Sequence, residues 1–200
     1  MIAPHEIPIP GPAAAFADRL AAQLPRLETA RLVLRGPRLG DFEAWAAVLT
    51  DARAVHMGGP FGRDDAIREF AAATGVWLLR GHGYWTVEHR DGGEVVGFTG
   101  VGFEPGDREP ELGWFFLPGA EGQGYATEAA AAARDHAIGP MGLPALVSYI
   151  DPPNTRSIRV AERLGARREA DLADASGDIC QVWRHWPEAA RPPQPHGRPA

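Results

Sequence analysis

The sequence contains no lysine, since all 20 of its basic residues are arginine. A Walker-type phosphate loop and a pyridoxal-phosphate Schiff base both need a lysine side chain, so these two classes of site are excluded. The single cysteine, Cys180, cannot form an internal disulfide. No run of about 18 apolar residues exists, and no membrane-spanning helix is expected. The amino terminus also lacks the basic start and apolar core of a secretory signal, which predicts a cytoplasmic protein.

Other absences narrow the possible ligands. The net charge is −6, and no basic cluster is longer than Arg167-Arg168, so no nucleic-acid partner is expected. The seven histidines show no metal-ligand spacing with the cysteine or with paired acids, which predicts no metal site. No Gly-x-Ser-x-Gly elbow occurs, and the commonest type of serine hydrolase is thereby excluded.

What is present is enough for one globular domain, with 200 residues, 44% of them hydrophobic and 23% charged. We expect an N-terminal arm with an accessory helix over 1–26, a folded domain over 27–186 and a disordered proline-rich tail over 187–200. Strands come first and then alternate with helices, which favours an α/β fold with a mixed sheet covered on both faces. The predicted strands are 27–35, 84–90, 94–103, 111–117, 145–150, 167–172 and 178–185. The predicted helices are 12–24, two that begin near Asp41 and Asp64, 124–138 and 154–165.

The segment from Glu111 to Ala129, ELGWFFLPGAEGQGYATEA, combines an aromatic strand, a glycine-rich bend and an alanine-rich helix. Gly122 and Gly124 have no Cβ, so the bend can adopt unusual dihedral angles and approach a ligand closely. The first amides of the helix that follows have no partner within the helix, and with the helix dipole they favour an anion. The segment therefore predicts a phosphate-binding turn.

This segment resembles the acetyl-coenzyme A signature of the GNAT acyltransferases, most closely the branch with the ribosomal-protein alanine N-acetyltransferases. The family pattern Gln/Arg-x-x-Gly-x-Gly/Ala falls on 121–126, and a Thr-Glu-Ala common in this branch follows at 127–129. Glu121 departs from the pattern, and we expect its carboxylate to point to solvent, away from the diphosphate. A second match begins at Asn154-Thr155-Arg156-Ser157 and ends at Ala166. Two motifs in the expected order are more specific than either alone.

The resemblance covers about residues 27–186 and implies a mostly antiparallel sheet of six to seven strands. In the family, the strands that correspond to 111–117 and 145–150 splay apart, and the pantetheine arm of the cofactor lies between them. By resemblance, the site residues that bind acetyl-CoA are Phe115, Phe116, Leu117, Gly122, Gln123, Gly124, Tyr125, Ala126, Thr127, Asn154 and Ser157. The amides of 123–127 are expected to hold the diphosphate and the backbone of 115–117 the pantetheine. Asn154 is also expected to cap the helix after it.

Glu111 is the first candidate for the catalytic base, because the branch often carries glutamate at this strand start, facing the acceptor. Many members of the family have a tyrosine acid at the position of Ala161, so Ser157 or a water must assist the leaving thiolate here. His56, His82 and Trp85 lie in segments that border the acceptor cleft in similar proteins. A histidine there could accept a proton, although packing or surface roles also fit each residue.

The sequence thus predicts an N-acetyltransferase that moves acetyl from acetyl-CoA directly to a primary amine. The acceptor is expected to be a small molecule or a protein N-terminus, and the negative charge of the chain favours a cationic one. Either a monomer or a homodimer is compatible with the sequence. Two alternatives stay open, namely a catalytically weak acyl-CoA-binding regulatory module and a nucleotide-binding protein that uses the glycine turn for another phosphate.

Overall fold

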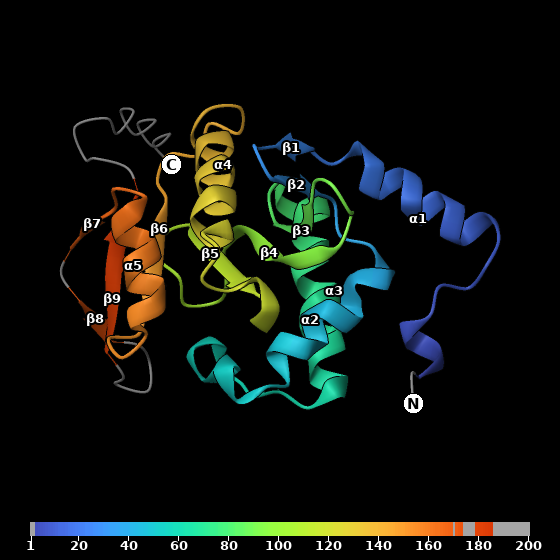
Figure 1. Ribbon diagram of the computed structural model, residues 1–200, viewed down its shortest axis with the longest axis horizontal. Coiled ribbons are helices and arrows are strands. Elements are labelled where there is room, and N and C mark those ends of the chain that lie inside the picture. Colours follow the sequence, from blue (N-terminus) through green and yellow to red (C-terminus); the bar gives the residue numbers. More distant parts are fainter. Residues whose placement is uncertain (1–2, 170, 174–178, 186–200) are drawn as a thin grey trace, which may run out of the picture.

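The computed structural model describes residues 3–169, 171–173 and 179–185. Its helices are η1 (Pro4–Glu6), α1 (Pro12–Gln23), η2 (Leu39–Asp41), α2 (Phe42–Leu49), η3 (Ala52–Met57), α3 (Arg63–Arg80), η4 (Pro118–Ala120), α4 (Tyr125–Ile138) and α5 (Thr155–Arg163), where η marks a short 3₁₀ helix. Its strands are β1 (Leu27–Glu28), β2 (Leu32–Arg35), β3 (Tyr84–His89), β4 (Val95–Gly102), β5 (Glu111–Phe116), β6 (Val147–Ile150), β7 (Arg167–Arg168), β8 (Leu172–Ala173) and β9 (Ile179–Arg184). Figure 1 shows their arrangement.

The strands form one mixed sheet in the order β1-β2-β3-β4-β5-β6-β9-β7, with β8 also paired to β9. Every pair is antiparallel except β5 with β6. Three of the nine described strands have only two residues, so the sheet consists mainly of six longer strands. The predicted fold class, a mostly antiparallel mixed sheet flanked by helices, is confirmed.

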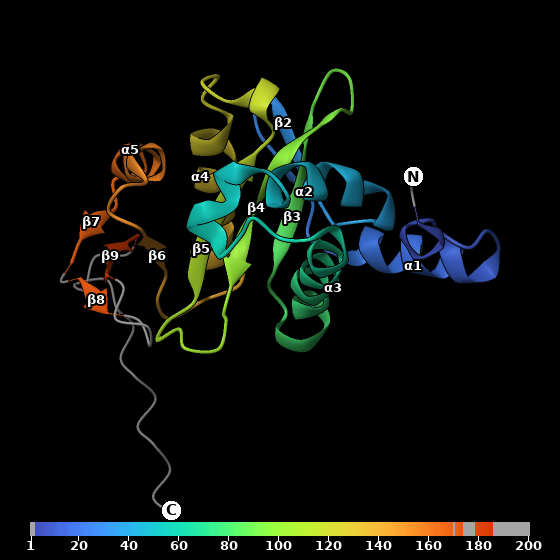
Figure 2. The same cartoon turned by 90° about the horizontal axis from the view of Figure 1, so that it is seen from below.

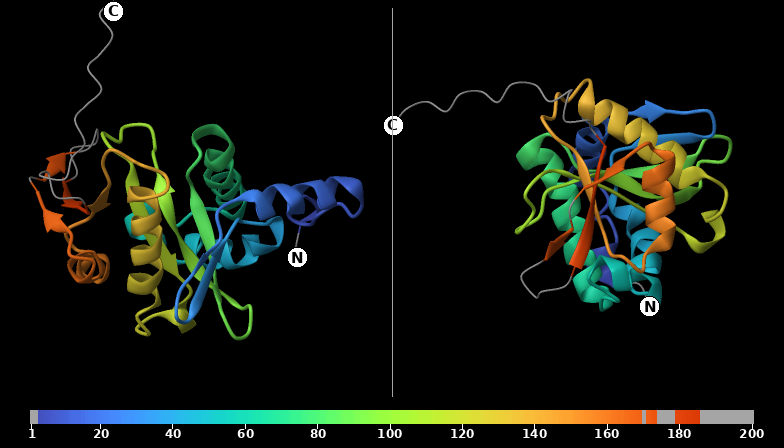
Figure 3. Two further views of the ribbon diagram at one scale, coloured as in Figure 1. Left: turned by 90° about the horizontal axis from the view of Figure 1, so that it is seen from above. Right: turned by 90° about the vertical axis from the view of Figure 1, so that its left-hand side faces the viewer.

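Helices cover both faces of the sheet (Figures 2 and 3). The alanine-rich side of α4 packs on one face, against side chains such as Leu112 and Phe116 of β5. On the opposite face, α2 and α3 pack with Phe98 of β4 and Phe115 of β5. Successive side chains of a strand point to opposite faces, so Glu111, with Phe115, lies on the face of α2 and α3.

Two predicted strands are wrong in their extent. The strand expected over 27–35 is broken between β1 and β2, because the Thr29 hydroxyl donates to the Glu128 carboxylate of α4 at 2.6 Å and the Arg31 amide donates to it at 2.9 Å. These bonds turn the chain toward α4. The strand expected over 167–172 is also divided, into β7 and β8, whereas the strand expected over 178–185 is present as β9 from residue 179.

The N-terminal arm lies at the end of the molecule where β1 forms the edge of the sheet. Its helix α1 projects away from the sheet (Figures 1 and 3). No residue of α1 is buried. The predicted tail, 187–200, falls outside the described residues. Among those described, no helix has the length and apolar character needed to cross a membrane.

A buried ionic network holds α2 against the sheet. Asp41, just before α2, accepts two bonds from the Arg35 guanidinium, at 2.7 and 2.8 Å, and one from the Thr86 hydroxyl at 2.7 Å. Arg35 also donates to Glu88 at 2.6 Å, and these carboxylates hold the pKa of Arg35 above its usual value despite its burial. A charged group buried this deeply needs all of its partners. The network therefore fixes the position of the start of α2 on the sheet.

Replacing Thr86 by Val is expected to lower the free energy of unfolding by about 1–3 kcal/mol, because the buried Asp41 carboxylate loses one donor and the shape of the side chain is kept. Urea denaturation measures this loss as a lower midpoint with an unchanged slope. The control is Thr50→Val, since Thr50 is exposed and its hydroxyl bonds only to the Ala46 carbonyl. Equal losses in both variants would contradict the role of Thr86.

Candidate active site

The glycine-rich turn lies directly before α4 and lines a long cleft. Gly122 and Gly124 have φ values of 74° and 80°, a left-handed conformation that other residues rarely adopt. Among the described residues, none of the six amides from 122 to 127 donates to a backbone carbonyl. The Thr127 hydroxyl, in the first turn of α4, is buried and has no hydrogen-bond partner. The turn thus offers amides and one hydroxyl to a ligand.

Not every predicted cofactor residue faces the cleft. Those that line it are Phe115, Phe116, Gly122, Gly124, Tyr125, Ala126, Thr127, Asn154 and Ser157. Gln123 is outside the lining, because its side chain donates to the Gly119 carbonyl at 2.8 Å and its own carbonyl accepts from Arg31 at 2.9 Å. Leu117 is also outside it, and its amide donates to Val96 of β4 at 2.9 Å.

The two central strands separate as the family resemblance implied. The parallel strands β5 and β6 share a single register pair, Glu111 with Val147. Beside this pair, β5 and β6 are joined by hydrogen bonds that involve side chains, in place of bonds between the two backbones. The Tyr149 amide donates to the Glu111 carboxylate at 3.3 Å, and the Ser148 hydroxyl donates to the Leu112 carbonyl at 2.5 Å. His185, buried behind Ser148, places its Nε2 atom 2.9 Å from the same hydroxyl.

The register decides which backbone groups of β5 are free beyond this point. The Leu112 carbonyl faces β6, while the Leu117 amide faces β4. The backbone N–H and C=O groups of successive residues in a strand point alternately to its two neighbours. The backbone groups of Trp114 and Phe116 therefore face the opening toward β6, and those of Phe115 face β4. Trp114, which the sequence reasoning treated only as core or cleft wall, therefore belongs to the candidate site.

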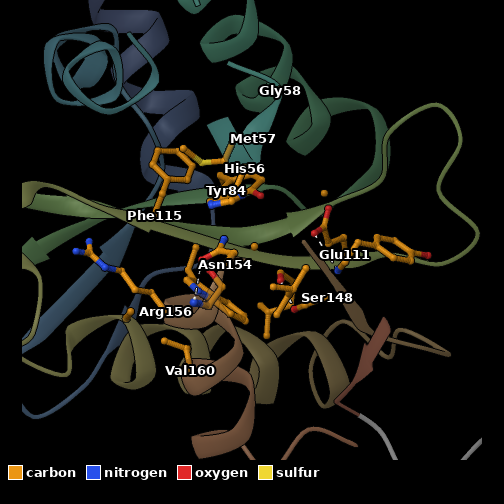
Figure 4. A pocket seen from close by; sticks show the side chains of 18 of the residues that line it. His56, Met57, Gly58, Tyr84, Glu111, Phe115, Ser148, Asn154, Arg156 and Val160 are labelled. Carbon is orange, nitrogen blue, oxygen red and sulfur yellow. Dashed lines mark hydrogen bonds between the residues drawn. The ribbon is translucent and has the colours of Figure 1, made fainter. Parts of the chain in front are cut away.

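On the other wall, α5 begins at the predicted cap. The side-chain oxygen of Asn154 accepts the Ser157 amide at 3.2 Å, so the predicted N-cap is confirmed. Both side chains line the cleft, and Figure 4 shows Asn154 there. Ala161, one turn further along α5, is fully buried against Ile150 and Trp183. An alanine has no hydroxyl group, so this position offers no acid to the cleft.

Glu111 lies where β5 and β6 meet, with its carboxylate in the cleft (Figure 4). Burial, and then the negative charges of Asp107 and Glu104, raise the pKa of Glu111 to about 8, against the smaller opposing effect of the Tyr149 amide. A carboxyl group that titrates near neutral pH can exchange a proton with an amine. This is the property that a general base at this position requires.

Tyr84 extends the site in a way the sequence reasoning missed. It is paired with Gly100 of β4, which is paired in turn with Gly113 of β5. A Cβ atom at Gly113 would collide with the Tyr84 hydroxyl. The two glycines therefore let the tyrosine ring lie across the sheet and carry its hydroxyl to β5, near Glu111 (Figure 4). Burial and the charge of Glu111 raise the pKa of Tyr84, so the hydroxyl keeps its proton.

The same side of the cleft is acidic. Glu69 of α3, and Glu104 and Asp107 between β4 and β5, line it together with Glu111. Burial and then the charge of Asp107 raise the pKa of Glu104, and burial raises the pKa of Asp107. In the part of the chain that the structure describes, no arginine or histidine forms an ion pair with these four carboxylates.

Of the three other residues expected near the acceptor, only His56 lines the cleft, where its Nδ1 atom lies 2.9 Å from Asp151. His82 is buried with Nδ1 2.9 Å from the Val101 carbonyl, and Trp85 belongs to the core under α4. Within the described residues, no three histidine, cysteine or acidic side chains group in a way that could hold a metal ion.

Glu121 is exposed, as expected, but its carboxylate is not free. Its two carboxylate oxygens accept bonds from Arg53 of η3 at 3.0 Å and from Arg156 of α5 at 2.7 Å. All three residues line the cleft beside the glycine turn. Arginines from two distant segments thus compensate the negative charge of Glu121 beside the glycine turn.

The chain is similar to known acetyltransferases. The crystal structure of an acetyltransferase from Agrobacterium tumefaciens is 36% identical, covers 81% of this chain and 94% of its own, and has a TM-score of 0.75. RimL, a ribosomal-protein alpha-N-acetyltransferase solved in complex with coenzyme A, shares the fold with a TM-score of 0.66 at 16% identity, over 80% of this chain and 97% of its own.

Sequence comparison agrees. A Bacillus subtilis protein named as the uncharacterized N-acetyltransferase YnaD is 38% identical over 64 residues, which make up 32% of this chain and 38% of that protein. The chain spans less than half the length of the curated relatives that it matches. A family model described as an acetyltransferase (GNAT) domain matches residues 31–167. The chain therefore belongs to the GNAT family of acetyltransferases, whose acyl donor is acetyl-CoA.

Proposed function

We propose that the chain is an N-acetyltransferase that moves acetyl from acetyl-CoA directly to a primary amine. One observation carries this proposal: the Glu111 carboxylate and the glycine turn before α4 line the same cleft, at the start of β5 and after its end. One end of the cleft offers donors to phosphates, and the other offers a proton acceptor to an amine. Direct transfer requires both in one cavity.

The turn fits the diphosphate of acetyl-CoA. Its free amides, the dipole of α4 and the unpartnered Thr127 hydroxyl all favour an anion. A cofactor bound there would extend along the opening, where the backbone groups of Trp114 and Phe116 can pair with the pantetheine amides as an added strand does. Acetyl-CoA supplies the acetyl group as a thioester, which is activated toward amines.

The residues around the opening divide the chemistry between them. A free backbone amide of β5 can donate to the thioester oxygen as negative charge develops on it. Glu111 takes the proton that the amine releases when the new C–N bond forms. The position of Ala161 offers no hydroxyl group to protonate the departing sulfur. The Ser157 hydroxyl, on the opposite wall of the cleft, can donate to this sulfur instead.

The acceptor side fits a cationic amine. Among the described residues, Glu69, Glu104, Asp107 and Glu111 form no ion pair, and after burial the nearby negative charges also raise the pKa values of Glu104 and Glu111. A positively charged acceptor relieves this repulsion and gains from the focused field of the cleft. Both a small di- or polyamine and a protein N-terminus followed by basic residues meet this description.

The test measures cofactor binding by calorimetry and thiol release over a panel of amines and short peptides. In matched pairs of acceptors, the one with a second positive charge is expected to have a kcat/KM about threefold to tenfold higher at low salt, with the advantage shrinking as salt is added. Coenzyme A binding without turnover of any amine would instead favour a regulatory module. Competition by ATP or a dinucleotide, with no affinity for coenzyme A, would favour a nucleotide-binding protein.

A further inference from the structure

The residues around Glu121 suggest how this chain manages a carboxylate beside a phosphate site. Glu121 directly precedes Gly122, the first glycine of the turn, so a bound diphosphate would lie close to its negative charge. The free amides of the turn favour an anion at the same place. Glu121 and the cofactor are therefore competing anions at the mouth of one cleft.

The two arginines that hold Glu121 are not equivalent. Arg53 has a second carboxylate partner, Asp51, at 2.9 Å, so its charge remains compensated without Glu121. Arg156 has Glu121 as its one ion-pair partner among the described residues, at 2.7 Å, and its side chain is 79% exposed. An exposed pair of this kind contributes little to stability, so exchanging its anion costs little.

We propose that Arg156 is a phosphate-binding residue that Glu121 holds in place until the cofactor arrives. In the free protein Arg156 pairs with the carboxylate, and on binding it exchanges this partner for a phosphate of the cofactor. A guanidinium pairs with carboxylate and phosphate in the same two-pronged geometry, so the exchange needs no large movement. This inference rests on the proposed function, because it assumes that the cofactor's phosphates lie at the glycine turn.

The exchange has an unusual consequence. Replacing Glu121 by Gln removes the repulsion of the phosphate and releases Arg156 at the same time, so the variant is expected to bind coenzyme A about threefold to tenfold more tightly at low salt. The gain should shrink at high salt, because both charges are exposed. Arg156→Gln is expected to bind coenzyme A more weakly by a similar factor. In the double variant, the gain from the Glu121 change should be smaller than in the wild-type background.

Calorimetry with coenzyme A at two salt concentrations measures these affinities without any turnover. Two controls make the same changes of charge elsewhere: Glu162→Gln, on the exposed side of α5, and Arg19→Gln, on α1, both outside the cleft lining. Neither should change the affinity. S-acetylpantetheine, which has no phosphate, should be used with the same KM by wild type and Glu121→Gln.

An unchanged or weaker affinity in Glu121→Gln, or an unchanged affinity in Arg156→Gln, would overturn the exchange. So would an equal gain in the Glu162 control. If folded wild-type protein shows no affinity for coenzyme A, the proposed function itself fails. The two failures are thus distinguishable in one set of titrations.

Discussion

Glu111→Gln is expected to lower kcat/KM by about 10²–10³-fold, because it removes the proton acceptor and leaves the size of the side chain unchanged. Burial and the nearby acids give Glu111 a pKa of about 8, so only about a tenth of the wild-type carboxyl groups are ionised at pH 7. The wild-type kcat/KM should therefore rise with pH and level off above about pH 8. The variant should lose this dependence.

The pH profile is best measured by thiol release with an acceptor whose own amine titrates below pH 7, so that the acceptor adds no slope. Asp107→Asn is the matched control. Asp107 is the charge that raises the pKa of Glu111 most, so its removal should move the midpoint of the profile to lower pH and keep the plateau. An unchanged profile in Glu111→Gln would remove Glu111 as the base.

Stability separates loss of chemistry from loss of fold. Because the folded protein raises the pKa of Glu111 from 4.5 to about 8, it holds this proton more tightly than the unfolded chain does. The resulting stabilisation is fully present below about pH 4.5 and is lost as the pH rises through 8. Gln cannot ionise, so Glu111→Gln should unfold at the same or a higher temperature than wild type at pH 9. A lower unfolding temperature there would mean that the activity loss reflects damage to the fold.

Local sequence was sufficient for the parts of the site that local geometry determines. The glycine turn, the start of α4 and the Asn154 cap each depend on a few consecutive residues, so their patterns predicted them directly. The position of Glu111 at a strand start was also predictable. Its raised pKa was not, because the rise comes first from burial, which depends on how distant segments pack, and then from the charges of Asp107 and Glu104 in the loop before β5.

The remaining features depend on contacts between distant segments. Tyr84 reaches the cleft only because two glycines on neighbouring strands share its register, and strand pairing cannot be read from one strand. Register also determines that Trp114 and Phe116, rather than Phe115, face the opening between β5 and β6. The ion pairs of Glu121 could not be predicted either, because its two arginine partners lie 68 and 35 residues away along the chain.

The glycine turn offers the sharpest test of cofactor binding. The double variant Gly122→Ala/Gly124→Ala is expected to lose coenzyme A affinity by about a hundredfold or more. Each alanine costs about 1–2 kcal/mol at a positive φ, and relief of that strain rotates the amides away from the phosphate. Calorimetry measures the affinity, and circular dichroism checks that the helices remain.

Gly142→Ala separates strain from ligand contact. Gly142 also has a positive φ, 63°, and has open space around it, but it lies in the connection between α4 and β6, outside the cleft lining. Its substitution imposes the same kind of backbone strain with no amide near the cofactor, so affinity for coenzyme A should stay at the wild-type value. If the control lost affinity as the double variant does, general destabilisation would explain both. If the double variant kept its affinity, the phosphates would have to bind elsewhere in the cleft, for example at the N-terminus of α5, where the Arg156 amide has no backbone partner among the described residues.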